Sequence, residues 1–134
     1  MWVDKKDLNN LGLPTLMKKV FNENNLPIPW YTELNDKRHF FEQIKERKLP
    51  LVLKPVDSRG ARGVLLLDEA VDLNWAYDTS LSFSPSKRVM LEEYLKGPQV
   101  STESLVVNGV VHTIGFSDRN YDRLDQYLPH IIED

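Results

Sequence analysis

The sequence has no cysteine among its 134 residues, which excludes disulfides, thiolate zinc sites and a cysteine nucleophile. No apolar run approaches the length that spans a bilayer, and the start, Met1-Trp2-Val3-Asp4-Lys5-Lys6, is not a secretory signal. A cytoplasmic location is therefore the default expectation. The formal net charge of −3 provides no overall basic field, so we expect neither nucleic acid nor membrane as a partner.

What is present is typical of a globular protein, with 41% hydrophobic and 28% charged residues in a chain long enough for one domain or two small lobes. Helical spacing predicts a first helix that ends near Asn24-Asn25, with an apolar stripe made of Leu13, Leu16, Met17, Val20 and Phe21. Lys18 and Lys19 are expected on its solvated side.

Two more helices are predicted, from about residue 36 to 47 and from about 72 to 80, with Asn35 or Asp36 and then Asp72 as their caps. A strand should follow over 88–93, and its alternation places Glu92 and Glu93 on opposite faces. These adjacent carboxylates fit either a strand that emerges into water or a functional site. Gly97-Pro98 then marks a connection between two lobes.

The stretch Pro50–Val64 organises the chain. An apolar run, Leu51-Val52-Leu53, leads to Lys54, and a polar loop with two glycines and two arginines separates it from a second apolar run, so two strands joined by a loop are predicted. Gly60 and Gly63 allow positive φ, so backbone N–H groups of this loop can form a concave nest for phosphate oxygens. An ordinary surface loop with two basic side chains remains the alternative, since the sequence is neither a Walker A loop nor Gly-x-Gly-x-x-Gly.

Asn108-Gly109 between two apolar runs predicts a hairpin with a two-residue type I′ turn, which pairs Val107 with Val110. A polar loop is expected over 117–126 and a final strand over 127–132. That strand would stop at Glu133-Asp134 without a turn or cap, so we expect the chain to be cut inside a fold.

Taken in order, these features resemble the ATP-grasp family, in which two α+β lobes hold ATP between them. The similarity rests on Leu53-Lys54-Pro55, the loop Ser-Arg-Gly-Ala-Arg-Gly-Val from Ser58, and Leu91-Glu92-Glu93-Tyr94. These motif sequences are most similar to those of the carbamoyl-phosphate-synthase-like and carboxylate–amine ligase branches of the family. The implied fold class is α+β: an antiparallel lid lobe with helices, followed by the start of a second antiparallel sheet. The implied division is 1–30 as leading helix and linker, 31–96 as lid lobe and 97–134 as the beginning of the second lobe.

The resemblance also implies roles for individual residues. Lys54 would contact the α- and β-phosphates, and Glu92 would accept a hydrogen bond from the adenine amino group. Backbone groups from Glu93 through Tyr94 to Leu95 would read the adenine edge. The loop that would close over the phosphates consists of Ser58, Arg59, Gly60, Ala61, Arg62 and Gly63.

The sequence departs from the family's pattern at three places. Gln99 stands where the family usually has a glutamate that binds the ribose hydroxyls, and an amide lacks the charge-assisted strength of a carboxylate. Leu13-Pro14 stands where the family often has another nucleotide-contacting lysine. The family's magnesium ligands lie further along than Asp134, so no metal ligand is assigned, and no catalytic residue either.

The implied function is that of an ATP-binding part of an enzyme that uses ATP and Mg²⁺ to activate a carboxylate as an acyl phosphate, for ligation to an amine or other nucleophile. The alternatives are a carbamoyl-phosphate synthase or carboxylase subunit, and a nucleotide-binding module without chemistry. We expect no ligation by the 134-residue chain alone and self-association through its exposed sheet.

Overall fold

A four-stranded antiparallel sheet forms the centre of the first part of the chain. The computed structural model describes residues 13–119 and 128–131. The strands are β1 (Tyr31–Glu33), β2 (Leu51–Pro55), β3 (Leu65–Leu67) and β4 (Val89–Glu93), in the order β1-β4-β2-β3. β2, β3 and β4 were predicted from the apolar runs, whereas β1, with the sequence Tyr-Thr-Glu, has no apolar run to indicate a strand.

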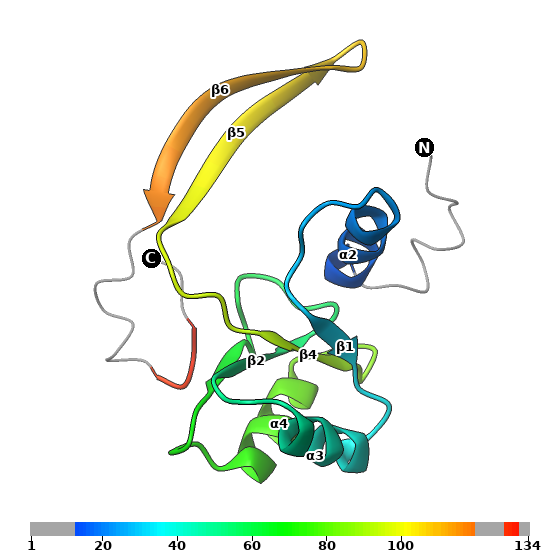
Figure 1. Ribbon diagram of the computed structural model, residues 1–134, viewed down its shortest axis with the longest axis vertical. Coiled ribbons are helices and arrows are strands. Elements are labelled where there is room, and N and C mark those ends of the chain that lie inside the picture. Colours follow the sequence, from blue (N-terminus) through cyan, green and yellow to red (C-terminus); the bar gives the residue numbers. More distant parts are fainter. Residues whose placement is uncertain (1–12, 120–127, 132–134) are drawn as a thin grey trace.

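One face of this sheet is packed against two helices, α3 (Lys37–Glu46) and α4 (Leu73–Ser82), as Figure 1 shows. Asp36, one of the two predicted candidates, caps α3: its carboxylate accepts from the backbone N–H of His39 at 2.7 Å. Asp72 caps α4 as predicted, and its carboxylate accepts from the N–H of Asn74 at 2.8 Å. Burial of apolar side chains between helices and sheet makes the core, which comprises Leu34, Phe40, Leu51, Leu53, Leu65, Leu67, Ala76, Tyr77, Val89 and Leu91.

The first helix, α2 (Leu13–Glu23), lies on the other side of the sheet (Figure 1). It ends as predicted, because Asn25 adopts a φ of 55° and the N–H of Leu26 turns back to the carbonyl of Phe21 at 2.9 Å. The predicted apolar stripe is wrong in its orientation. Met17 is 49% exposed, whereas Lys18 is 7% exposed.

The hairpin consists of β5 (Gln99–Val107) and β6 (Val110–Arg119), and it projects away from the first sheet (Figure 1). Val107 pairs with Val110 as predicted, and positive φ angles at both Asn108 and Gly109 are those of a type I′ turn. The polar loop expected from residue 117 is wrong at its start, because β6 continues to Arg119, and the rest of that loop lies outside the described residues. A register shift at Glu103/Ser104, a β-bulge or similar irregularity, was not predicted.

The segment 128–131 returns to the first sheet. The N–H of Leu66 donates to the carbonyl of Pro129 at 2.7 Å, and the N–H of Ile131 donates to Val64 at 3.0 Å. His130 forms an isolated antiparallel bridge with Leu65, so this segment extends the β3 edge. The ends of the strand expected over 127–132 lie outside the described residues.

The fold class is therefore α+β with antiparallel sheets, as predicted. Within residues 13–119 and 128–131, no helix is both long enough and apolar enough to cross a bilayer.

Candidate functional site

The face of the sheet toward α2 carries the charged residues that the sequence singled out. Glu92 on β4 is opposite Val52 on β2, and Lys54 is two residues further along β2, so the two side chains are diagonal neighbours on one face. Lys54 Nζ donates to Glu92 Oε1 at 2.5 Å. Residues assigned to the phosphate end and the base end of a nucleotide thus contact each other directly.

Lys18 completes this cluster, and the sequence analysis missed it. Its Nζ lies 2.7 Å from Glu92 Oε2 and 5.0 Å from the centroid of the Tyr31 ring. One signal could have found it: Lys18 is four residues after Pro14, hence one helical turn along the same face. The resemblance places the family's lysine position at Leu13-Pro14, and the helical pattern predicts Lys18 in solvent; the second prediction is wrong, because Lys18 is buried.

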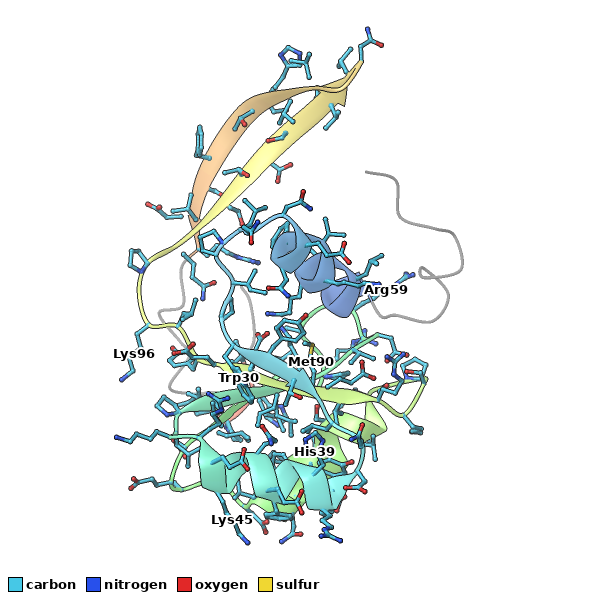
Figure 2. The ribbon with its side chains drawn as sticks, turned by 45° about the vertical axis from the view of Figure 1, so that its right-hand side comes forward. Trp30, His39, Lys45, Arg59, Met90 and Lys96 are labelled. Carbon is cyan, nitrogen blue, oxygen red and sulfur yellow. The ribbon has the colours of Figure 1, made fainter. Side chains whose placement is uncertain are left out.

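The loop Ser58–Gly63 connects the end of β2 to β3, and three of its residues have the left-handed backbone that an anion nest uses. Gly60, Ala61 and Gly63 have φ of 60°, 53° and 74°. Positive φ at Ala61 was not predicted, because the residue carries a Cβ. Arg59 and Arg62 are exposed, and Figure 2 shows Arg59 on the side of the sheet that α2 occupies.

Both ends of this loop are held in place. The Asp57 carboxylate accepts from Ser84 Oγ at 2.6 Å and from the N–H of Ser86 at 2.9 Å. Burial raises the pKa of Asp57, but these hydrogen bonds and the positive charge of Arg88 outweigh it and leave the pKa below its ordinary value. Arg88 also forms a two-pronged ion pair with Glu33, 2.5 Å and 2.8 Å between its nitrogens and the carboxylate oxygens.

At the other end of the loop, Gly63 is buried. A Cβ built there would lie 2.9 Å from Phe83 Cβ and 3.0 Å from Pro55 Cγ. By contrast, a Cβ at Gly60 meets nothing within 4 Å. The middle of the loop is therefore open while its ends are packed. Its mobility without ligand stays a prediction.

The hinge, which is the segment 93–95 expected to read the adenine edge, lies at the opposite end of the sheet from the loop. β2 and β4 are antiparallel, so the loop follows the Pro55–Val89 pair and the hinge follows the Leu51–Glu93 pair. Four residue steps separate the two pairs, which is roughly 14 Å along the strands. Lys54 and Glu92 lie between them.

One predicted contact of the hinge is not available. The backbone N–H of Glu93 donates to the carbonyl of Trp30 at 2.9 Å, so it cannot also read an adenine edge. Tyr94 and Leu95 lie past the end of β4, and Leu95 is exposed. Gln99 is the first residue of β5 and exposed, opposite Arg119. The structure thus brings Lys54 and Glu92 together and places Gln99 on the separate hairpin.

A cavity of about 340 Å³ lies elsewhere, at the start of α4 beside the segment 128–129. Its lining includes Val71, Trp75 and Pro129, and Trp75 meets His130 edge to face. None of the predicted nucleotide-binding residues lines it.

The described residues do not fit a magnesium ion. No group of three histidine or acidic side chains within residues 13–119 and 128–131 is arranged to hold a metal. Glu92 and Glu33, the carboxylates on the α2 side, are each engaged by a basic side chain.

The sequence matches no protein-family model and no curated protein sequence. Solved structures do match in fold. A D-alanine–D-alanine ligase from Helicobacter pylori superposes with a TM-score of 0.64 at 18% identity, over 81% of this chain and 35% of its own. A biotin carboxylase from Campylobacter jejuni, in a β,γ-ATP complex, has a TM-score of 0.73 at 21% identity, over 86% and 28%. The fold is that of the ATP-grasp enzymes.

A third ATP-grasp neighbour is the biotin carboxylase domain of Hydrogenobacter thermophilus 2-oxoglutarate carboxylase, solved with MgADP, ADP and bicarbonate. Its TM-score is 0.71 at 21% identity, over 88% of this chain and 28% of the other. This chain spans about a third of the length of these ATP-grasp structures, which include both ligases and carboxylases.

Proposed function

We propose that this chain is the nucleotide-binding part of an ATP-grasp enzyme and that adenine nucleotide lies along the face of the sheet toward α2. The observation that carries this proposal is the contact of Lys54 with Glu92 on that face, between a loop with three residues of positive φ and the residues that follow β4. The phosphates would lie toward Ser58–Gly63 and the base toward Tyr94 and Leu95.

Charge supports this placement. The chain as a whole carries −3, yet cations gather around the α2 side of the sheet. Lys18 and Lys54 share one carboxylate, and Arg59 and Arg62 are exposed on the loop beyond. Phosphate oxygens are anions that backbone N–H groups of a turn and flanking basic side chains can bind together.

The whole enzyme would use ATP to activate a carboxylate. A carboxylate oxygen attacks the γ-phosphorus, ADP leaves, and an amine or other nucleophile then attacks the acyl carbon and releases phosphate. Lys54 and the loop would hold the phosphates in position for that transfer, with Gln99 at the ribose. A carboxylase or carbamoyl-phosphate-forming reaction is the second candidate, because the similar structures include biotin carboxylases.

The division of the chain into a leading helix (1–30), a lid lobe (31–96) and the beginning of a second lobe (97–134) is part of the proposal. So is self-association. The hairpin exposes large apolar side chains, among them Val106 at 67%, Ile114 at 68% and Phe116 at 75% exposure, and it has no sheet partner among the described residues.

Calorimetric titration of Lys54→Ala tests the proposed site. The variant loses a charge that faces the phosphates, so its affinity for ATP should fall by roughly tenfold or more, whereas its affinity for adenosine should not fall. Lys45→Ala is the control, because Lys45 is an exposed lysine on α3, on the opposite side of the sheet (Figure 2). Equal losses for ATP and adenosine in Lys54→Ala would show that Lys54 does not face the phosphates.

A further inference from the structure

Glu92 holds two lysines at once. Its Oε1 is 2.5 Å from Lys54 Nζ and its Oε2 is 2.7 Å from Lys18 Nζ. The two lysines belong to separate elements: Lys54 to the neighbouring strand β2 and Lys18 to the helix α2. All three side chains are largely shielded from water, with 13% exposure for Glu92, 9% for Lys18 and 20% for Lys54.

This cluster has one negative and two positive charges, so it carries a net charge of +1 in a shielded place. A shielded charge without a full counter-charge is costly, and this cost falls when an anion arrives. The contact with Lys18 is also imperfect: Glu92 Oε2 is buried and accepts no well-aligned hydrogen bond from the described residues, in spite of its 2.7 Å distance from the ammonium. The carboxylate therefore compensates only part of the positive charge of the two lysines, and another anion can take its place.

We propose that Glu92 is an internal anion that occupies Lys18 and Lys54 while the site is empty, and that ligand phosphates displace it. The inference rests on the proposed function and adds a coupling between the two ends of the nucleotide. Phosphates that bind the ammonium groups release the carboxylate, which is then free to accept a hydrogen bond from an amino group on the base. Lys18, from α2, becomes a second phosphate-binding lysine beside Lys54.

The sign of the coupling follows from the charges. Without phosphates, a base that engages Glu92 must draw it away from two shielded ammonium groups and leave them uncompensated. With phosphates in place, that cost disappears. Phosphate binding should therefore tighten base binding, and by thermodynamic linkage the base should tighten phosphate binding by the same factor. An isolated base or an isolated phosphate should bind weakly, and ATP should bind well.

The test is calorimetric titration of the chain with pyrophosphate, with adenosine, and with each in the presence of the other, in one buffer of fixed salt. Glu92→Gln keeps the shape of the side chain and removes its charge. It should bind pyrophosphate roughly tenfold more tightly than the original chain, within the usual range of such couplings. Glu69→Gln, a change of an exposed residue in the β3–α4 loop, controls for net charge and should bind pyrophosphate like the original chain. Thermal melting shows whether both variants are folded.

In the original chain, saturating pyrophosphate should increase the affinity for adenosine roughly fivefold or more, and Glu92→Gln should abolish that increase. A folded Glu92→Gln variant that binds pyrophosphate no more tightly than the original chain would overturn the proposal. An adenosine affinity of the original chain that does not change with pyrophosphate would also overturn it.

If ATP still binds to the original chain in either case, the proposed function survives without the further inference. If the original chain binds no ATP, both fail. If Glu92→Gln does not fold, Lys18→Met decides: loss of the adenosine–pyrophosphate coupling supports the proposal, and an unchanged coupling overturns it.

Discussion

Lys54 and Glu92 face each other diagonally across adjacent strands, with the ammonium nitrogen 2.5 Å from a carboxylate oxygen. The register that brings them together is fixed by the apolar residues on the opposite face, which are Leu51, Leu53 and Leu91. A slip of one residue would move these side chains from the core to the face toward α2. The same pairing of β2 with β4 thus places the core residues on one face of the sheet and the charged residues on the other.

Lys18→Ala should weaken ATP binding. If Lys18 binds phosphate oxygens, its loss removes a charge-assisted interaction of about 1.5–3 kcal/mol, which is roughly ten- to 150-fold in affinity. Lys19→Ala removes the same charge from the exposed neighbouring position of α2 and should leave the affinity within a factor of about two. Titration calorimetry of both variants decides. Equal effects would mean that only the total charge of the helix matters.

Gly63→Ala should destabilise the protein more than Gly60→Ala. Both residues have positive φ, which costs a residue with a Cβ about 1–2 kcal/mol. Only at Gly63 does the new methyl group also meet Phe83 and Pro55, which adds about 1–3 kcal/mol of overpacking. Urea denaturation of the two variants gives the difference in the free energy of unfolding. Indistinguishable midpoints would show that the end of the loop is not packed as described.

Sequence reasoning reached the loop, Lys54 and Glu92, but not the second lysine or the engaged hinge N–H. Period-2 alternation and turn residues are local signals, and they predicted β2, β4, the helix caps and the hairpin register. The burial of Lys18 depends on how α2 is rotated over the sheet, which packing against Tyr31 and Glu92 decides and helical spacing alone does not. In the same way, the hydrogen bond from Glu93 to Trp30 depends on the pairing of β1 with β4, and β1 has no apolar run that would indicate a strand in the sequence.

Asp57 should make stability depend on acidity. Its folded pKa lies below its ordinary value, so its contribution to stability is present above the unfolded pKa of about 4 and is lost as the pH falls through the lower folded pKa. Asp57→Asn should therefore be less stable than the original chain at pH 6, and the difference between them should shrink below about pH 4. Thermal melts across this range measure it. A gap that stays constant down to the lowest pH would mean that the Ser84 and Ser86 hydrogen bonds do not favour the charged form.

The hairpin should mediate self-association. Val106 and Val111 form a directly opposed pair with 67% and 63% exposure, so Val106→Lys with Val111→Glu replaces an apolar pair by an ion pair while keeping the strands paired. Light scattering over a range of concentrations should show a smaller mean mass for this double variant. Leu26→Lys, at an exposed apolar residue after α2, is the control and should behave like the original chain. A double variant that associates as before would place the contact elsewhere.

The measurement that tests the account most directly is the mapping of ATP onto the chain by backbone amide chemical shifts. ATP should shift amides at both ends of the α2-side face, in the loop Ser58–Gly63 and at Tyr94 and Leu95, and should leave the amides of Val71 and Trp75 beside the separate cavity unchanged. Adenosine alone should shift the hinge amides and spare the loop. Shifts confined to Val71 and Trp75, or no shifts at any ATP concentration up to the millimolar range of weak ligands, would contradict a nucleotide site on this face.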